Sequence, residues 1–265
     1  MPTHDEAIEI LVDNESIAGT FVTPSTRMPG LLFVHGWGGS QEQYLARARE
    51  AAALGCLSLT LDLRGHAGTR PLSETVSREN NLRDVLAAYD MLASHPQVDP
   101  SAIGVVGSSY GGYLAAILTH LRAVKWLALR APALYMDSGW ELPKRQLHKD
   151  QDLDTYRKSL IPAKDNRALR AAAAFDGDVL LVESEFDNTI PSTVISNYRE
   201  AFIKAQSLTY RVMKGADHGL SEQAHQRAYT VLLINWLGEM IFGERPENVN
   251  PQKVPDRGEV PESAY

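Results

Sequence analysis

Short apolar runs alternate along this chain with longer segments in which apolar side chains recur every three or four positions. The short runs are rich in β-branched residues or leucine, which is typical of strands, and they cover 7–12, 17–22, 31–34, 57–61, 103–106, 124–129, 179–182 and 208–212. The helical periodicity covers about 41–54, 78–94, 110–120, 193–205 and 222–241. This order predicts an α/β fold, in which helices flank a mostly parallel central sheet of about eight strands that begins with an antiparallel pair.

Two segments interrupt this alternation. Residues 135–165 are polar and charged with scattered apolar side chains, and they predict a small insertion or cap after the sixth strand. Residues 244–265 hold four prolines, eight charges and almost no apolar side chains, so they predict an extended tail that forms no core. We expect a single domain over 1–243. A tail of this kind becomes ordered only against another surface, and a homodimer is one arrangement that would supply it.

Composition and charge argue against several classes of function. The chain has 265 residues with a formal net charge of −7, so it lacks a broad basic field for nucleic acid or an anionic membrane. Cys56 is the single cysteine, which excludes an intramolecular disulfide and a cysteine-based metal cluster. The acidic N-terminal segment does not resemble a secretory signal, and no apolar run approaches the ~18 residues of a membrane span. We therefore expect a cytoplasmic protein.

The segment Gly107–Gly111, with the sequence GSSYG, matches the pattern G-x-S-x-G with Ser109 at its centre. A predicted buried strand precedes it and a predicted helix follows it. Such a turn lifts the serine hydroxyl clear of the sheet and directs a helix N-terminus towards it, where developing negative charge is stabilised. A plain glycine-rich turn would explain the pattern equally well if no base and acid were present. Ser109 is therefore a candidate nucleophile that requires both.

A serine hydroxyl becomes a good nucleophile only when a histidine held by a carboxylate removes its proton. His218 lies in the loop after the last predicted strand, at the same edge of the sheet as Ser109, and His66 is its main competitor. The acid is expected after the strand 179–182, where Glu183, Glu185 and Asp187 are all candidates. The spacing of Asp187 from the following Ile-Pro, at which a helix is predicted to begin, favours Asp187.

Four motifs follow one another in the chain, each after a predicted strand: HGWGG, DLRGH, GSSYGG and GADHG at 35–39, 62–66, 107–112 and 215–219. In this order they resemble the α/β-hydrolase superfamily, and the resemblance extends over about residues 8–242. The sequence SSYGG is similar to that of prolyl-oligopeptidase-like enzymes. The resemblance implies a catalytic triad of Ser109, Asp187 and His218.

The resemblance also implies that the backbone amides of Trp37 and Tyr110 form an oxyanion hole. Glycines around Trp37 allow its amide to turn towards the nucleophile, and one such donor contributes about 3 kcal/mol to lowering the barrier in other enzymes. A mechanism of this type requires neither a metal nor an organic cofactor.

Other motif residues are given supporting roles. We expect His35 to bond within its own loop, and Arg64 to pair with a carboxylate that stiffens the loop 62–66. Candidate substrate-binding residues are His66 and three residues at the start of the insertion, namely Tyr135, Met136 and Trp140. The ring of Trp37 could either wall the acyl pocket or simply pack.

The sequence favours a serine hydrolase of the carboxylesterase type, which cleaves small to medium carboxylic esters through an acyl-enzyme intermediate. A serine nucleophile argues against dehalogenases and dienelactone hydrolases, which usually place aspartate or cysteine there. The alternatives are a short-peptide peptidase and an acyltransferase. Prolyl-oligopeptidase-like enzymes normally carry a large N-terminal propeller, whereas only about thirty residues precede the first core strand here. A binding protein without catalysis is less expected, because it has no need of a complete triad.

Overall fold

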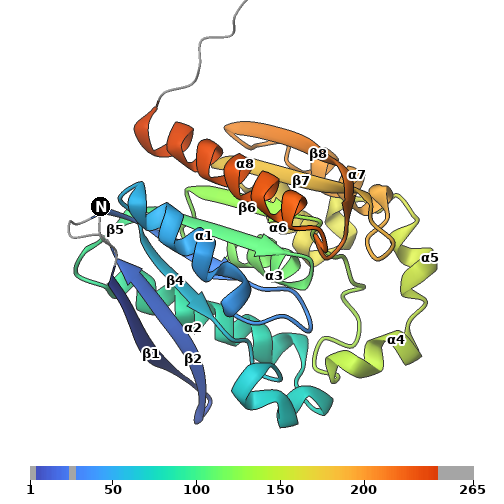
Figure 1. Ribbon diagram of the computed structural model, residues 1–265. Coiled ribbons are helices and arrows are strands. Elements are labelled where there is room, and N and C mark those ends of the chain that lie inside the picture. The colour runs from blue at the N-terminus through green and yellow to red at the C-terminus, as the bar shows by residue number, and fades with distance from the viewer. Residues whose placement is uncertain (1–3, 24–27, 244–265) are drawn as a thin grey trace, which may run out of the picture.

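An eight-stranded sheet in the order β1-β2-β4-β3-β5-β6-β7-β8 forms the centre of the computed structural model, which describes residues 4–23 and 28–243 (Figure 1). The pairs β1–β2 and β2–β4 are antiparallel and the remaining neighbours are parallel. The strands are β1 (His4–Val12), β2 (Glu15–Thr23), β3 (Met28–Val34), β4 (Leu57–Leu61), β5 (Val98–Ser108), β6 (Trp126–Arg130), β7 (Asp178–Phe186) and β8 (Ser207–Asp217). The predicted fold class is confirmed, including the antiparallel start. The prediction for 244–265 concerns a segment outside the described residues.

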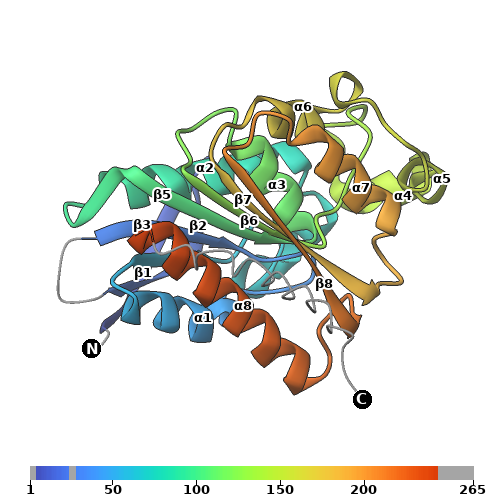
Figure 2. The same cartoon turned by 90° about the horizontal axis from the view of Figure 1, so that it is seen from above.

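Helices cover both faces of the sheet (Figure 2). One face carries α1 (Glu42–Ala53) and α8 (Gln223–Phe242). The opposite face carries α2 (Arg78–Ser94), α3 (Tyr110–Leu118), α6 (Arg167–Ala174) and α7 (Ser192–Ala201). Among the helices of the described ranges, none combines the length and hydropathy that crossing a bilayer requires.

The core consists of two apolar layers, one on each side of the sheet. In β3, Leu32 and Val34 belong to the layer under α2, α3, α6 and α7, whereas Leu31 and Phe33 belong to the layer under α1 and α8. Parallel strands covered on both faces read as continuous apolar runs, which is why the sequence pattern revealed them. The parallel strands therefore end at one common edge, and the loops that follow them meet there.

The insertion lies beyond this edge of the sheet in both views (Figures 1 and 2). It contains the short helices η2 (Lys144–Gln146), α4 (Leu147–Asp150), α5 (Leu153–Arg157) and η3 (Ala163–Asp165), and a further 3-10 segment, η1 (Ala67–Glu74), follows the motif at 62–66. The sequence pattern missed α6, whose buried face is made mostly of alanine. Asn166 begins that helix, because its side chain accepts hydrogen bonds from the amides of Ala168 and Leu169.

Candidate active site

Ser109 lies at a sharp turn between β5 and α3, with a φ of 51° and a ψ of −118°. Non-glycine residues rarely adopt positive φ, so the surrounding structure must hold this conformation. The Ser109 amide donates to the carbonyl of Arg130 (2.9 Å), and the Ser109 carbonyl accepts from the amides of Tyr113 (3.1 Å) and Ala133 (2.9 Å). β6 and the first turn of α3 thus fix the serine.

The glycines on either side of Ser109 are required by close backbone contacts. A Cβ atom on Gly111 would lie 2.2 Å from the carbonyl oxygen of Val34, and one on Gly107 would lie 2.6 Å from the carbonyl oxygen of Gly111. The G-x-S-x-G pattern therefore has a steric reason as well as a conformational one, because β3, β5 and α3 meet too closely for side chains there.

Three side chains from separate loops form a hydrogen-bonded chain at the edge where the strands end. His218, between β8 and α8, places Nε2 3.0 Å from Ser109 Oγ. Its Nδ1 lies 2.7 Å from Oδ2 of Asp187, which directly follows β7. Nδ1 donates to the carboxylate, so Nε2 is left to accept the serine proton. The chain can therefore move a proton from the serine hydroxyl to an imidazole whose opposite side faces a carboxylate.

The carboxylate of Asp187 is held in its ionised form. Burial by itself would raise its pKa, but the hydrogen bonds from His218 and from the amides of Ile190 (2.7 Å) and Thr189 (2.8 Å) lower the pKa below the usual range of an aspartate. Both amides bind Oδ1, whereas His218 binds Oδ2. Asp187 is thus charged at neutral pH and fixed in orientation.

The other candidate acids are engaged elsewhere. Glu185 binds the Lys214 ammonium and the Gly215 amide, each at 2.8 Å. Glu183 accepts a hydrogen bond from the hydroxyl of Tyr210. Of the three acids that the sequence left open, the structure brings Asp187 to His218.

Two backbone amides beside Ser109 are free to bind a ligand oxygen. Within residues 4–23 and 28–243, neither the Trp37 amide nor the Tyr110 amide donates a hydrogen bond. Tyr110 begins α3, directly after the serine. The loop before Trp37 packs against the serine so closely that a Cβ on Gly36 would lie 3.3 Å from Ser109 Cβ. These are the amides that the sequence assigned to an oxyanion hole.

His66 supports the loop that carries the Trp37 amide. Its Nε2 accepts a hydrogen bond from the Gly38 amide (3.0 Å), while Nδ1 lies 3.2 Å from the carbonyl oxygens of Leu63 and Arg64. The two carbonyls require the proton on Nδ1, which leaves Nε2 as the acceptor. His66 is buried and does not line the cavity beside Ser109. The structure therefore gives it a positioning contact, and the substrate contact that the sequence suggested stays a prediction.

Further contacts tie the motif 62–66 to its neighbours. Asp62 Oδ1 accepts a hydrogen bond from the Gln41 amide at 2.7 Å. Arg64 Nε lies 2.5 Å from Oδ1 of the buried Asp84, which is the carboxylate partner expected for this arginine. The loop after β4 thus stiffens the loop after β3.

His35 is fully buried beneath these loops, at 0% exposure. Nδ1 donates to the Gly36 carbonyl (2.8 Å), and Nε2 accepts from the Leu63 amide (3.1 Å). Protonation of Nε2 would break the second bond. Burial lowers the pKa of His35 to about 4. His35 therefore bonds within its loops, as expected, and stays neutral at physiological pH.

This burial predicts a specific loss of stability in acid. In the unfolded chain a histidine has a pKa of about 6.5, so between pH ~6.5 and ~4 the unfolded state binds more protons than the folded state. The free energy of unfolding should therefore fall by about 3 kcal/mol through this window because of His35 alone. Urea unfolding at pH 7 and pH 4 would measure it. A His35→Gln variant should show a smaller loss between the two pH values, whereas replacement of the exposed His120 should leave the loss as in the wild type. An equal loss in His35→Gln would contradict the assignment.

The structure does not bring Tyr135, Met136 or Trp140 to the cavity beside Ser109. Tyr135 packs edge-on against the ring of Tyr113, with ring centroids 5.0 Å apart, and the Trp140 indole donates to Glu79. The Met136 carbonyl accepts a hydrogen bond from the Arg78 guanidinium, at 2.6 Å. These residues join the start of the insertion to α2 and α3. They were predicted to bind substrate because they open the insertion, and that role stays a prediction.

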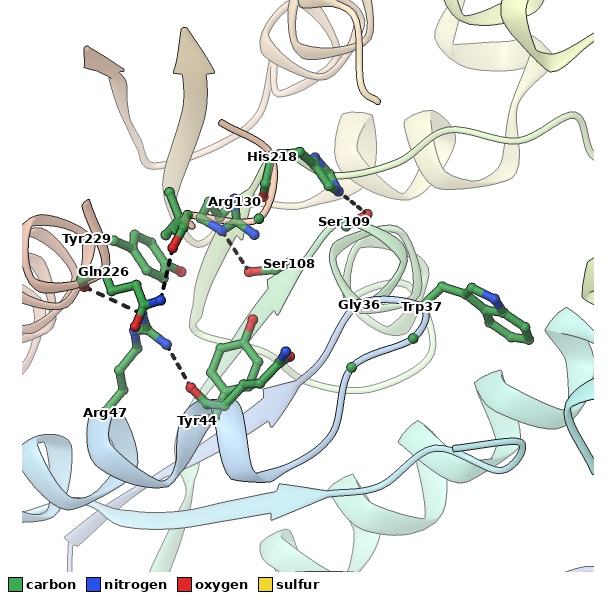
Figure 3. Close-up of a pocket in the computed structure, with 15 residues that line it drawn as sticks. Gly36, Trp37, Tyr44, Arg47, Ser108, Ser109, Arg130, His218, Gln226 and Tyr229 are labelled. Atoms are coloured by element: carbon green, nitrogen blue, oxygen red, sulfur yellow. Dashed lines mark hydrogen bonds between the residues drawn. The ribbon is translucent and has the colours of Figure 1, made fainter. Parts of the chain in front are cut away.

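The ring of Trp37 packs in the same region. It lies edge-on against His66, with ring centroids 4.7 Å apart, and the Lys144 ammonium lies 4.3 Å from its centroid. In Figure 3 the ring extends away from Arg130 and Tyr229. Trp37 thus presents its backbone to the site, while its ring packs.

The cavity beside Ser109 and His218 has a volume of about 290 Å³ and extends towards α1 and α8 (Figure 3). Its polar walls come from residues that the sequence pattern did not single out, namely Gln43, Tyr44, Arg47, Arg130, Gln226 and Tyr229. Arg130 had a signal that could have been read, since a charged residue directly follows the apolar run of β6 at the edge that holds Ser109. The helical residues had none, because their facing each other depends on how α1 and α8 pack. In the part of the chain that the structure describes, no group of three or more metal-ligating side chains occurs.

Comparison with protein families gives a match to the prolyl oligopeptidase family over residues 43–243. An uncharacterized peptidase of Bacillus subtilis, YuxL, is 26% identical in a match 160 positions long, which covers 54% of this chain and 23% of that protein. The match thus spans about a quarter of the length of that relative.

Solved structures share the fold at low sequence identity. An acylaminoacyl peptidase from Pyrococcus horikoshii is 18% identical with a TM-score of 0.69, covering 92% of this chain and 43% of that one. A putative dienelactone hydrolase from Klebsiella pneumoniae is 16% identical with a TM-score of 0.67, covering 92% and 100%. Est1E from Butyrivibrio proteoclasticus is also 16% identical, with a TM-score of 0.67 and coverage of 89% and 99%.

Proposed function

Because this chain belongs to the prolyl oligopeptidase family, we propose that it is a serine hydrolase that cleaves small to medium carboxylic esters. The observation that carries this proposal is the continuous contact from Ser109 Oγ through His218 to Asp187, at 3.0 and 2.7 Å. A nucleophile, a base and an orienting acid within hydrogen-bond reach are the requirements of acyl transfer through a serine.

In the proposed reaction, Ser109 Oγ attacks the ester carbonyl while His218 Nε2 takes the hydroxyl proton. The amides of Trp37 and Tyr110 donate to the oxygen that becomes negative, and Asp187 stabilises the imidazolium. The imidazolium then protonates the leaving alcohol, so the carbon–oxygen bond breaks and the acyl group stays on Ser109. A water molecule that loses a proton to His218 then attacks the acyl-enzyme. The bond from Ser109 Oγ to the acyl carbon breaks, the imidazolium returns its proton to Oγ, and the carboxylic acid is released.

Hydrolysis of short peptides is the second candidate function, and the family match favours it because the matched relative is described as a peptidase. The same side chains would serve, with an amine in place of the alcohol as the leaving group. Transfer of the acyl group to an alcohol other than water is a variant of the same chemistry.

A substrate panel distinguishes these functions. We expect p-nitrophenyl acetate and butyrate to be turned over, and aminoacyl p-nitroanilides to show no detectable kcat/KM, because an anilide is a much poorer leaving group than a phenolate and its cleavage requires a site adapted to amides. Clear turnover of the anilides would assign the chain as a peptidase. A fluorophosphonate probe should label Ser109 in either case, since the probe requires an activated serine. Absence of labelling would indicate a binding protein and reject the hydrolase.

A further inference from the structure

The cavity beside the proposed triad is basic, although the chain as a whole carries a net charge of −7. Two guanidinium groups, those of Arg47 and Arg130, line it together with the phenol ring of Tyr229 (Figure 3). No aspartate or glutamate belongs to its lining among the described residues. A concave site of this size next to a reactive serine is suited to part of a small ligand.

Arg130 is buried at the floor of this cavity, with 8% of its surface exposed. Its Nε donates to Ser108 Oγ (3.2 Å) and its Nη1 to the backbone carbonyl of His218 (2.8 Å). Both partners are neutral. Within the described ranges Arg130 forms no ion pair, and its Nη2 donates no hydrogen bond. The guanidinium thus places a positive charge beside Ser108, which precedes Ser109 in the chain, and beside His218 of the proposed triad.

Arg47 comes from α1 on the opposite wall. Its Nη1 donates to the Gln43 carbonyl (2.8 Å) and its Nη2 to the Gln226 carbonyl (3.5 Å), so its partners are neutral as well. Its Nε is buried and has no hydrogen-bond partner in the described part of the chain. Arg49, two residues further along the same helix, pairs with Asp5 at 2.5 Å. Among the described residues, Arg49 therefore has a carboxylate partner, whereas Arg47, which faces the cavity, has none.

Tyr229 lies between the two arginines. The centroid of its ring is 5.0 Å from Cζ of Arg47 and 5.8 Å from Cζ of Arg130. Its hydroxyl is buried near the Ser108 side chain and makes no well-formed hydrogen bond among the described residues. Burial raises the pKa of Tyr229 to about 12, so the hydroxyl keeps its proton and remains a donor at neutral pH.

Two partly or fully buried cations with only neutral acceptors are unfavourable until an anion joins them, because a desolvated charge needs an opposite one. Guanidinium groups bind carboxylates through paired N–H donors, and a phenol hydroxyl can add a third. We propose that this cavity is an anion subsite, in which Arg47, Arg130 and Tyr229 bind a carboxylate carried by the substrate. The preferred substrates are then short esters with a free carboxylate, such as half-esters of small dicarboxylic acids. This inference rests on the proposed function for its catalytic part.

The kinetic test compares matched esters. Monomethyl succinate and monomethyl glutarate carry the carboxylate on the acyl side, with methyl butyrate and methyl valerate as their neutral counterparts. 4-Carboxyphenyl butyrate carries it on the leaving group, with phenyl butyrate as its counterpart. In one of these two arms, kcat/KM for the anionic ester should exceed that of its counterpart by on the order of tenfold to a hundredfold. The arm that shows the preference identifies the side of the scissile bond that enters the cavity.

Variants assign the preference to the cavity. Arg47→Gln should reduce the ratio of anionic to neutral kcat/KM by about tenfold or more. Arg49→Gln is the matched control, because Arg49 belongs to the same helix and pairs with Asp5 outside the cavity; the wild-type ratio should persist. Tyr229→Phe keeps the ring and loses only the hydroxyl, so a severalfold fall in the ratio would support the site even if Arg47→Gln did not fold.

A binding measurement separates the subsite from catalysis. Glutarate should bind to the Ser109→Ala variant in calorimetry, and the additional change Arg47→Gln should weaken this binding by about tenfold or more. Glutarate binding without turnover of any ester would reject the hydrolase and retain the anion site. Turnover of neutral esters with anionic-to-neutral ratios near one and no glutarate binding would retain the hydrolase and overturn the anion site.

Discussion

Ser109→Ala should lower kcat for p-nitrophenyl butyrate by on the order of 10⁴- to 10⁶-fold, because no other group in the proposed mechanism can form the acyl-enzyme. The substitution removes the hydroxyl that contacts His218 Nε2 at 3.0 Å. The backbone hydrogen bonds of residue 109 remain. Alanine meets the same strain as serine at a φ of 51°, so the free energy of unfolding should change by no more than about 0.5 kcal/mol. Steady-state kinetics and urea unfolding would measure the two effects.

The adjacent serine offers a matched control. Ser108 Oγ accepts a hydrogen bond from Arg130 and lies outside the contact between Ser109 and His218. A fluorophosphonate probe should therefore label the Ser108→Ala protein and fail to label the Ser109→Ala protein. Labelling of both variants, or turnover by Ser109→Ala close to that of the wild type, would remove Ser109 from the mechanism.

Asp187→Asn should lower kcat by on the order of 10⁴-fold while the protein stays folded. Oδ1 of Asp187 accepts from the amides of Thr189 and Ile190, so the asparagine carbonyl will occupy that position. The asparagine NH₂ then faces Nδ1 of His218, where the carboxylate Oδ2 now lies at 2.7 Å. Two donors cannot face each other, so the imidazole proton must move to Nε2. In that tautomer His218 cannot accept the proton of Ser109, which is the cause of the expected loss.

The neighbouring acids provide the control for this prediction. Glu185→Gln changes a carboxylate that binds Lys214 and Gly215, and Glu183→Gln changes one that binds Tyr210. Neither contacts His218, so both variants should retain kcat within about tenfold of the wild type. If a glutamate variant lost as much kcat as Asp187→Asn, the orienting acid would have to be reassigned.

The motifs that could be identified from sequence are those that leave a short, contiguous pattern in the chain. The turn at Gly107–Gly111 needs glycines where β3, β5 and α3 approach each other, and this requirement is visible as G-x-S-x-G. Buried parallel strands appear as short apolar runs because both of their faces are covered. By contrast, α6 was missed because it has only eight residues and its buried face offers three alanines and a single leucine, which give a short and weakly apolar run in the sequence.

The residues around the candidate site that escaped prediction depend on contacts across the fold. Glu183, Glu185 and Asp187 were open alternatives, because the backbone after a strand can turn in several ways; the bend after β7 brings Asp187 to His218. The contact of His66 with the Gly38 amide was not foreseen either, because it depends on how the loop after β4 folds under the loop after β3.

The sequence by itself determined the mostly parallel α/β sheet, the position of Ser109 at a strand-to-helix turn, and the loop that carries His218. Each follows from the local alternation of apolar and polar residues and from the short glycine-containing patterns that mark the turns. Only the tertiary structure decided which acid faces the imidazole and that Arg47 and Arg130 share a cavity. Arg47 and Gln226, on two walls of that cavity, are 179 positions apart in the chain. Their meeting depends on how α1 and α8 pack on the same face of the sheet, and no short stretch of residues encodes that arrangement.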